Sequence, residues 1–166
     1  MADVLLPDDL VALAKRVIEE NAAAGRTVAV AESCTGGLVA AALTEIAGSS
    51  AVFDRGYVTY SNEAKEQMLG VPSDIIETFG AVSIACAWAM AKGAIEKSGA
   101  DVAVSISGIA GPGGGSEQKP VGTVVFARFR RDCEGEPEGE MRHFGDLGRG
   151  EIRRQAALVA LELLLP

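Results

Sequence analysis

The feature that most constrains the fold is a short apolar run followed at once by a turn of small residues and a helix. Residues 27–31 are rich in valine and alanine and follow Gly25 and Arg26, a pattern typical of a buried strand. Residues 38–46 place apolar side chains at helical spacing. Together these segments predict a strand that leads directly into a helix, as in α/β domains.

The turn between them, residues 31–37 (AESCTGG), gathers two hydroxyls, a thiol and two glycines. A strand-to-helix turn directs backbone N–H groups towards one point and adds the positive end of the helix dipole. Such a point suits a phosphate, a carboxylate or the oxyanion of acyl transfer. We therefore expect function to centre here, with the N–H groups near Thr35, Gly36 and Gly37 as candidates for an oxyanion hole.

The rest of the chain continues the alternation of strands and helices. Further strands are predicted at residues 52–60, 101–107, 121–129 and 140–145, and residues 130–138 are predicted to form a solvated hairpin tip. Helices are predicted from Asp8 or Asp9, as N-caps, to near Gly25, and at residues 61–69, 73–79, 83–98 and 150–165. This order predicts one α/β domain over residues 1–166, a three-layer α/β/α sandwich with a mixed, mostly parallel sheet.

Composition excludes several classes of partner. The chain of 166 residues has a formal net charge of −8, whereas binding to a phosphate backbone requires clustered Lys and Arg. No apolar run approaches the ~20 residues that span a bilayer, and the N-terminus lacks the pattern of a signal peptide. We therefore expect no nucleic-acid partner, no membrane partner and a cytoplasmic location.

Cysteine and histidine content argues against a metal centre. The three cysteines, Cys34, Cys86 and Cys133, are widely spaced and form no CxxC pair, which indicates a reducing compartment and no zinc site. His143 is the only histidine, so neither a His-based metal site nor a Ser-His triad is expected. The sequence predicts no metal and no cofactor.

Three segments are expected to meet at one edge of the sheet. In open α/β sheets, ligands bind beyond the carboxyl ends of the strands. The 31–37 turn, the segment 60–65 and the glycine-rich loop 108–120 each follow a predicted strand. That edge would then hold Ser33, Tyr60 and Lys65 beside two glycine-rich stretches of backbone.

These side chains suit acyl transfer or amide hydrolysis without a metal. The Ser33 hydroxyl needs a base to take its proton. Lys65 can serve if burial or a neighbouring cation lowers its pKa. Tyr60 is placed to orient the Lys65 amine or to relay a proton.

Each candidate also has a structural interpretation. Ser33 is equally suited to cap a helix, and Cys34 to pack as a small apolar residue rather than act as a nucleophile. Glu32 is suited either to orient a ligand hydroxyl or to pair with a nearby cation. Lys65 on a short helix is, by default, a solvated surface residue. From spacing alone, the sequence indicates an α/β domain with an anion-binding edge.

Six stretches resemble the CinA C-terminal-domain family, the nicotinamide-nucleotide amidases. In chain order they are AESCTGG (31–37), IAGSS (46–50), VTYSNEAK (58–65), GAVS (80–83), SISGIAGPGGGS (105–116) and KPVGTV (119–124). The resemblance covers roughly residues 27–127, and the closing helix is similar too. The chain resembles the stand-alone form of the family, because no molybdopterin-binding-like domain precedes these stretches.

The resemblance implies hydrolysis of the carboxamide of nicotinamide mononucleotide to nicotinic acid mononucleotide and ammonia by a Ser–Lys mechanism. Carried onto this sequence, Ser33 is the nucleophile, Lys65 the general base and Tyr60 a supporting hydroxyl. The implied substrate-binding residues are Glu32, Cys34, Thr35, Gly36, Gly37, Ser105, Ser107, Gly108, Gly111, Gly113 and Arg149. Arg149 takes the place of the arginine in a Gly-Asp-Arg run, although the spacing here is Gly145-Asp146-Leu147-Gly148-Arg149.

Two alternatives to an amidase stay open at this point. One is a non-catalytic nucleotide- or phosphate-binding module, and the other an interaction protein in competence or damage response. The amine of Lys65 favours the amidase, because a binding module needs no group that deprotonates Ser33. The apolar stretch 84–95, the apolar last helix and the family resemblance predict a homo-oligomer.

Overall fold

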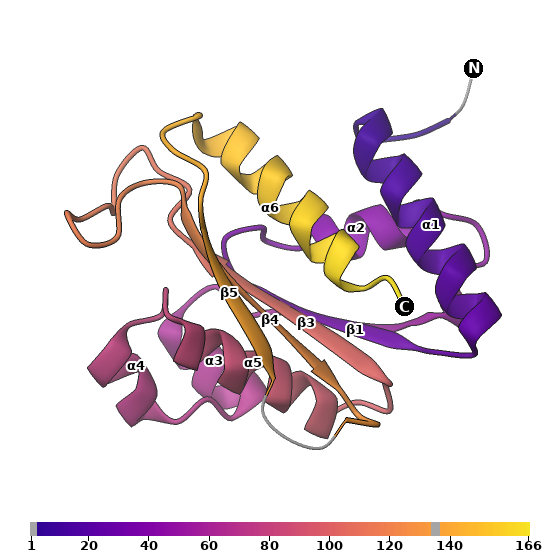
Figure 1. Cartoon of the computed structure of the whole chain (residues 1–166), viewed down its shortest axis with the longest axis horizontal. Coiled ribbons are helices and arrows are strands. Elements are labelled where there is room, and N and C mark those ends of the chain that lie inside the picture. The colour runs from indigo at the N-terminus through magenta and orange to yellow at the C-terminus, as the bar shows by residue number, and fades with distance from the viewer. Residues whose placement is uncertain (1–2, 134–136) are drawn as a thin grey trace.

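A five-stranded sheet forms the centre of the protein (Figure 1). The structure, a computed structural model, describes residues 3–133 and 137–166. Strand order across the sheet is β2-β1-β3-β4-β5. The strands are β1 (Val28–Glu32), β2 (Phe53–Val58), β3 (Val102–Gly108), β4 (Thr123–Arg130) and β5 (Glu138–His143).

The sheet is only partly parallel. β1 pairs in parallel with β2 and β3, whereas β4 pairs antiparallel with both β3 and β5. The α/β class predicted from the sequence is confirmed, but the prediction of a mostly parallel sheet is wrong. The reason lies in the connection from β3 to β4, which contains no helix among the segments that the structure assigns, and a parallel pair needs a crossover connection.

Helices cover both faces of the sheet (Figure 1). One face carries α1 (Asp8–Ala24), α2 (Leu38–Thr44) and α6 (Arg149–Leu163), and the other carries α3 (Asn62–Leu69), α4 (Ser73–Phe79) and α5 (Ile84–Glu96). A short 3₁₀ turn, η1 (Ser49–Ala51), lies between α2 and β2.

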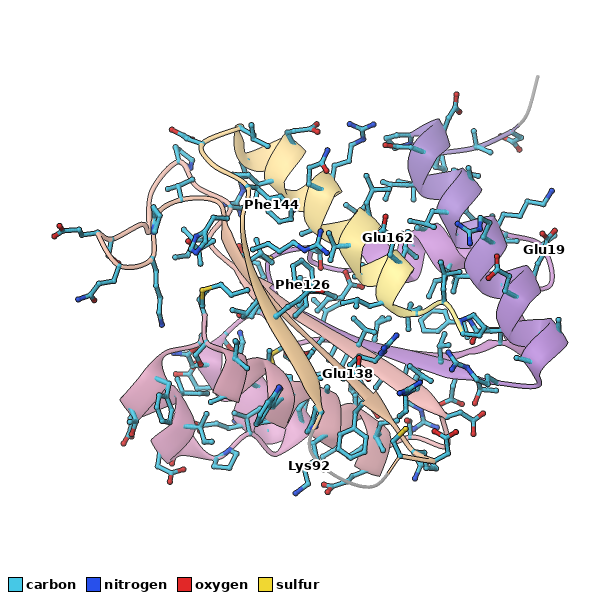
Figure 2. All side chains as sticks on the ribbon, in the orientation of Figure 1. Glu19, Lys92, Phe126, Glu138, Phe144 and Glu162 are labelled. Carbon is cyan, nitrogen blue, oxygen red and sulfur yellow. The ribbon has the colours of Figure 1, made fainter. Side chains whose placement is uncertain are left out.

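The larger hydrophobic core lies between the sheet and the face with α1, α2 and α6. Alternate residues of β1 and β3, such as Val30 and Val104, point into it, as the period of two along a strand requires. Phe126 of β4 is fully buried in this core beneath α6 (Figure 2). This packing fixes α6, and with it the helix N-terminus, over the sheet.

The opposite face of the sheet is lined by small residues, which lets helices approach closely. Ala29 and Ala31 of β1 pack with Met90 of α5 in a second core. At Gly93 of α5, an added Cβ would lie 2.0 Å from the carbonyl oxygen of Leu69. Only glycine therefore fits where α5 meets the end of α3, and this close contact places α3 beside the sheet edge.

Helix ends follow the chemistry that the sequence predicts, with one correction. Ser61 and Ser83 each accept a backbone N–H as N-caps of α3 and α5, and Gly25 ends α1 in the left-handed conformation. The predicted N-caps of the first helix are wrong, because Pro7 occupies the cap and Asp8 and Asp9 fall in the first turn, where acidic side chains suit the helix dipole.

The late hairpin differs from its predicted range at the start of β5. Residues 134–136 of the predicted hairpin tip lie outside the described residues, and β5 begins earlier than predicted, at Glu138.

No helix in the described part of the chain has the length and apolar character needed to cross a membrane.

Candidate active site

A cavity lies at the carboxyl ends of three neighbouring strands. Ser33 follows β1, Tyr60 follows β2, and Gly108 ends β3. Because these strands run in one direction, the segments that follow them meet at one edge of the sheet, as predicted. The cavity has a volume of about 280 Å³ and is lined by Ser33, Cys34, Tyr60, Asn62, Lys65, Ala81, Val82, Arg149, Gly113, Gly114 and residues 107–111.

Ser33 and Lys65 are in direct contact. Lys65 Nζ lies 2.9 Å from Ser33 Oγ, and it also lies 2.9 Å from the carbonyl oxygen of Thr59 and 3.2 Å from that of Tyr60. The Lys65 side chain is 1% exposed and Ser33 is 8% exposed. The interpretation of Lys65 as a solvated surface residue is therefore wrong.

The surroundings of Lys65 shift its amine towards the neutral form. Burial lowers the pKa of Lys65 below the ordinary value for lysine. No ion pair found in residues 3–133 and 137–166 includes this side chain. A neutral amine has two N–H donors and one lone pair, so the two carbonyl oxygens can take both donors. The lone pair is then directed at the Ser33 hydroxyl, which is the geometry of a general base.

Tyr60 and Arg149 meet at the mouth of the cavity. Arg149 Nη2 donates to the Tyr60 hydroxyl at 3.0 Å, and Arg149 Nη1 donates to the carbonyl oxygen of Gly111 at 2.8 Å. Tyr60 contacts the Lys65 amine through its backbone carbonyl rather than through its hydroxyl. Arg149 thus connects the start of α6, the segment after β2 and the glycine-rich loop.

Glu32 was predicted to bind the substrate, but in the structure its carboxylate bonds to the protein itself. Its carboxylate is fully buried and lies outside the cavity lining. It accepts hydrogen bonds from Thr35 Oγ1 at 2.6 Å and from the N–H groups of Gly37, Val39 and Ala40 at 3.0 to 3.2 Å. The protein's own carboxylate therefore occupies the N-terminus of α2, where the sequence suggested that a ligand anion would bind.

Three neighbours of Glu32 that were also predicted to bind substrate lie outside the cavity lining. Thr35 is fully buried with its hydroxyl on Glu32. The N–H of Gly36 donates to the Ser33 carbonyl at 3.0 Å, and that of Gly37 donates to Glu32. None of the three lines the cavity. Gly36 and Gly37 have φ values of +60° and +104°, so their role is to let the backbone turn into α2.

Cys34 lines the cavity but is a poor nucleophile. The side chain is 6% exposed, and burial raises the pKa of its thiol to about 11. A thiol needs to ionise in order to attack, and a raised pKa keeps it protonated at neutral pH. Cys34 therefore forms part of the cavity wall beside Ser33.

The two predicted serines of β3 have different positions. Ser107 lines the cavity, and its hydroxyl donates to the carbonyl of Ala81 at 2.9 Å. Ser105 is fully buried outside the cavity, and its hydroxyl donates to the carbonyl of Ala87 in α5 at 2.6 Å. Ser105 thus lies away from the other predicted substrate-binding residues of the cavity, and it links α5 to the sheet.

The predicted glycines of the loop after β3 all line the cavity. At Gly111, φ is +80° and an added Cβ would lie 2.6 Å from Val121 Cγ1. At Gly108, an added Cβ would lie 2.7 Å from Val124 Cγ2. At these two positions the backbone itself therefore forms the cavity wall, and Gly113 lines the cavity as well.

The structure adds residues that the sequence analysis did not single out. Asn62 lines the cavity at the start of α3, and the carbonyl of Thr59 holds the Lys65 amine. Arg153 donates to the carbonyls of Cys34 and Thr35 from α6. Its position four residues after Arg149, on the same helix face, was a usable signal. Which backbone atoms the Arg153 side chain reaches depends on how α6 packs against the sheet.

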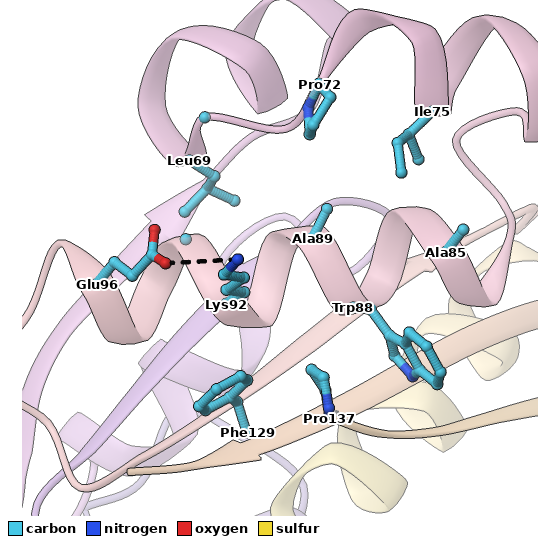
Figure 3. Close-up of a pocket in the computed structure, with 12 residues that line it drawn as sticks. Leu69, Pro72, Ile75, Ala85, Trp88, Ala89, Lys92, Glu96, Phe129 and Pro137 are labelled. Carbon is cyan, nitrogen blue, oxygen red and sulfur yellow. Dashed lines mark ion pairs between the residues drawn. The ribbon is translucent and has the colours of Figure 1, made fainter. Parts of the chain in front are cut away.

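A second, larger cavity of about 450 Å³ lies away from these groups. It borders α5, with Pro72 and Ile75 on one side of the helix and Phe129 and Pro137 on the other (Figure 3). Its lining is mainly apolar, and its one ion pair, Lys92 with Glu96, is largely exposed. Because it contains no hydroxyl or thiol, the reactive groups lie in the smaller cavity.

No site for a metal is formed by the residues that the structure describes, since nowhere among them do three His, Cys, Asp or Glu side chains come together.

Comparisons with known proteins agree with this arrangement. The family described as "CinA C-terminal domain" matches residues 10–166. The chain is 53% identical over 156 residues to nicotinamide-nucleotide amidohydrolase PncC of Escherichia coli K12, covering 94% of this chain and 93% of the relative. It is 48% identical to a CinA-like protein of Akkermansia muciniphila over 92% of this chain, but that match spans only 36% of the longer relative.

Among solved structures, the competence/damage inducible protein CihA from Agrobacterium tumefaciens is similar over nearly its full length. The two share 52% sequence identity with a TM-score of 0.93, and the match covers 99% of this chain and 97% of that one. The predicted family resemblance is confirmed: the chain belongs to the CinA C-terminal domain family.

Proposed function

We propose that this protein is a nicotinamide-nucleotide amidohydrolase that converts nicotinamide mononucleotide to nicotinic acid mononucleotide and ammonia. The observation that carries the proposal is the buried amine of Lys65 at 2.9 Å from the hydroxyl of Ser33. The Escherichia coli relative, a nicotinamide-nucleotide amidohydrolase with 53% identity over most of both chains, supports the choice of substrate.

In the proposed acylation step, Ser33 Oγ attacks the carboxamide carbon while its proton passes to Lys65 Nζ. The carbonyl oxygen becomes an oxyanion in the tetrahedral intermediate. When the intermediate collapses, the carbon–nitrogen bond breaks and Lys65 returns the proton to the leaving nitrogen. Ammonia departs, and an ester joins the substrate to Ser33.

Deacylation uses the same groups in the reverse direction. A water molecule gives a proton to Lys65 Nζ and attacks the ester carbon. Collapse of the second tetrahedral intermediate releases nicotinic acid mononucleotide, and Ser33 recovers its proton from Lys65. This proposed sequence uses no cofactor and no metal ion.

The mouth of the cavity suits the phosphate of the substrate. Arg149 supplies the one guanidinium group of the lining, and the flanking wall is the backbone of Gly111, Gly113 and Gly114. We propose that Arg149 and N–H groups of this loop hold the phosphate. Tyr60, whose hydroxyl bonds to Arg149, positions the guanidinium and supports the reaction from the mouth rather than at the amine.

We further propose that residues 1–166 form one three-layer catalytic domain that acts in the cytoplasm as a homo-oligomer. Cys34, Cys86 and Cys133 are all free thiols, which suits a reducing compartment. Large apolar side chains at Val58, Phe79 and Leu147 are about half exposed and offer contacts for a second copy. Light scattering of the purified protein would test the oligomer directly.

The test of the proposed function measures ammonia and nicotinic acid mononucleotide released from nicotinamide mononucleotide after treatment with a chelator. We expect equal amounts of both products from wild type and none from Ser33→Ala. Ser105→Ala is the matched control, because it removes a hydroxyl that lies outside the cavity, and its turnover should stay within about twofold of wild type.

Two outcomes would contradict the proposal. Release that persists in Ser33→Ala would exclude Ser33 as the nucleophile. No release by wild type, with binding of the mononucleotide retained, would instead favour a non-catalytic binding module.

A further inference from the structure

Arg153 contacts the turn that carries Ser33 without lining the cavity. Its Nε donates to the carbonyl of Cys34 at 3.0 Å, and its Nη2 donates to the carbonyl of Thr35 at 3.1 Å. The side chain comes from α6, which packs against the sheet over the larger core. Arg153 therefore fixes two consecutive peptide groups directly after the serine.

The hydrogen bonds of this turn leave the N–H of Cys34 without a backbone acceptor among the described residues. There, the N–H of Ser33 donates to Ile106, that of Gly36 donates to the Ser33 carbonyl, and that of Gly37 donates to Glu32. Neither Cys34 nor Thr35 donates its N–H to another backbone group in the same part of the chain, and of the two only Cys34 lines the cavity. Buried donors without an acceptor are rare, so the N–H of Cys34 is placed for a ligand oxygen in the cavity.

The planarity of the peptide bond links Arg153 to this donor. In a trans peptide, the C=O of one residue points opposite to the N–H of the next. Holding the Cys34 carbonyl therefore aims the Thr35 N–H away from Arg153. The Thr35 carbonyl, which Arg153 holds, shares its peptide group with the Gly36 N–H, and this N–H donates to the Ser33 carbonyl. The Ser33 carbonyl in turn shares its peptide group with the Cys34 N–H, so Arg153 also fixes the direction of that donor.

We propose that the N–H of Cys34 is a donor of the oxyanion hole and that Arg153 is the positioning residue that aligns it. The inference rests on the proposed amidase function, because it assigns a group that stabilises the tetrahedral intermediate of that reaction. The guanidinium adds positive charge at the same place. Burial raises the pKa of the Cys34 thiol, whereas Arg153 acts in the direction that favours an anion there.

The test compares Arg153→Met with Arg154→Met, which removes the neighbouring arginine of the same helix. Arg154 bonds to Asp9 and Glu151 and has no contact with the turn, so it controls for lost helix stability. With nicotinamide mononucleotide as substrate, Arg153→Met should lower kcat about 100-fold or more and leave KM within about threefold. Arg154→Met should keep kcat within about twofold of wild type.

A second readout separates alignment of the hole from a general structural role. Pyridine-3-boronic acid forms a tetrahedral anion with a serine hydroxyl and so mimics the intermediate. Arg153→Met should weaken inhibition by this compound by about the same factor as kcat, while the affinity for nicotinic acid mononucleotide stays within about threefold. Arg153→Lys, which keeps the charge but loses the two-point contact, should retain more kcat than the methionine variant.

Several results would overturn the inference. One is a kcat of Arg153→Met that stays within threefold of wild type. Another is a loss of affinity in Arg153→Met that is as large for the product as for the boronate. A third is a loss of kcat in Arg154→Met as large as that in Arg153→Met. If Arg153→Met does not fold at the assay temperature, Arg153→Lys carries the same boronate and product comparison. A wild type that releases no ammonia contradicts the proposed function itself, and the inference then falls with it.

Discussion

At the scale of single residues, the proposed mechanism depends on the charge state of Lys65, because only the neutral amine can take the proton of Ser33. The amine has three acceptors around it, namely Ser33 Oγ and the carbonyls of Thr59 and Tyr60. Carbonyl and hydroxyl oxygens do not compensate a buried ammonium as a carboxylate would, and burial lowers the pKa of Lys65. Burial therefore shifts Lys65 towards the form that accepts a proton.

This charge state predicts the pH dependence of the reaction. Because the neutral amine is the active form, kcat/KM should rise with pH through the lowered pKa of Lys65 and fall tenfold per pH unit well below it. The measurement is the initial rate of ammonia release from nicotinamide mononucleotide between about pH 5 and pH 10.

His143→Gln is the control for this profile, because His143 is the only histidine and bonds to Thr123 outside the cavity lining. The variant should keep the same rising limb. The assignment of Lys65 as the base would be contradicted if the rise of kcat/KM with pH disappeared in His143→Gln. It would also be contradicted if the wild-type rate stayed constant down to pH 5.

The sequence predicted the reactive pair at this scale but not all of its neighbours. Ser33 and Lys65 follow from the chemistry of the turns and from the family resemblance. Glu32 and Ser105 were assigned to the substrate, yet their polar atoms bond to the helices that pack against them. Such partners depend on how helices pack onto the sheet, which residue spacing does not determine.

At the scale of elements, Glu32 joins the first strand to α2. Its carboxylate accepts N–H groups from the first turn of the helix, where a negative charge also suits the helix dipole. We expect Glu32→Gln to lower the free energy of unfolding by about 2–3 kcal/mol, because the new amide cannot accept the same donors. Urea denaturation followed by circular dichroism measures this change.

Glu45→Gln provides the matched control at the other end of α2. Its carboxylate is half-buried and accepts the N–H of Leu5, far from the first turn. Removing a negative charge near a helix C-terminus is neutral or slightly favourable, so stability should change by less than about 0.5 kcal/mol. Equal effects of the two substitutions would refute the special role of Glu32.

Most element boundaries could be predicted approximately, and the error in the direction of β4 has a physical cause. Periodicity and caps located all six helices, and α4 matches its predicted range of residues 73–79. The direction of β4 was not recognised, although residues 108–120 contain turn-forming glycines and no helical pattern. Without a crossover helix, β4 has to run back beside β3, so the connection already specified an antiparallel pair.

At the scale of the whole molecule, topology separates the reactive cavity from the larger one. The carboxyl ends of β1, β2 and β3 bring together residues far apart in the chain, from Ser33 to Arg149. The larger cavity borders α5 and contains apolar side chains that no strand end positions. The cavity that we propose as the active site is thus the smaller of the two, and it is the one at the carboxyl ends of the strands.

Filling the larger cavity should therefore leave the reaction intact. Ala89→Leu places a bulkier apolar side chain there without touching Ser33 or Lys65. We expect kcat and KM for nicotinamide mononucleotide to stay within about twofold of wild type, because Ala89 lies outside the reactive cavity. A loss of more than tenfold in kcat, with the melting temperature unchanged, would show that the two cavities are coupled.

The central claim is that Ser33 forms a covalent bond to the substrate during turnover. The most direct measurement is mass spectrometry of the protein after acid quench during turnover of nicotinamide mononucleotide, followed by peptide mapping. The account predicts an added mass equal to the acyl group of nicotinic acid mononucleotide, located on Ser33 and absent in Ser33→Ala. An acyl group on Cys34, or turnover that persists in Ser33→Ala, would contradict it.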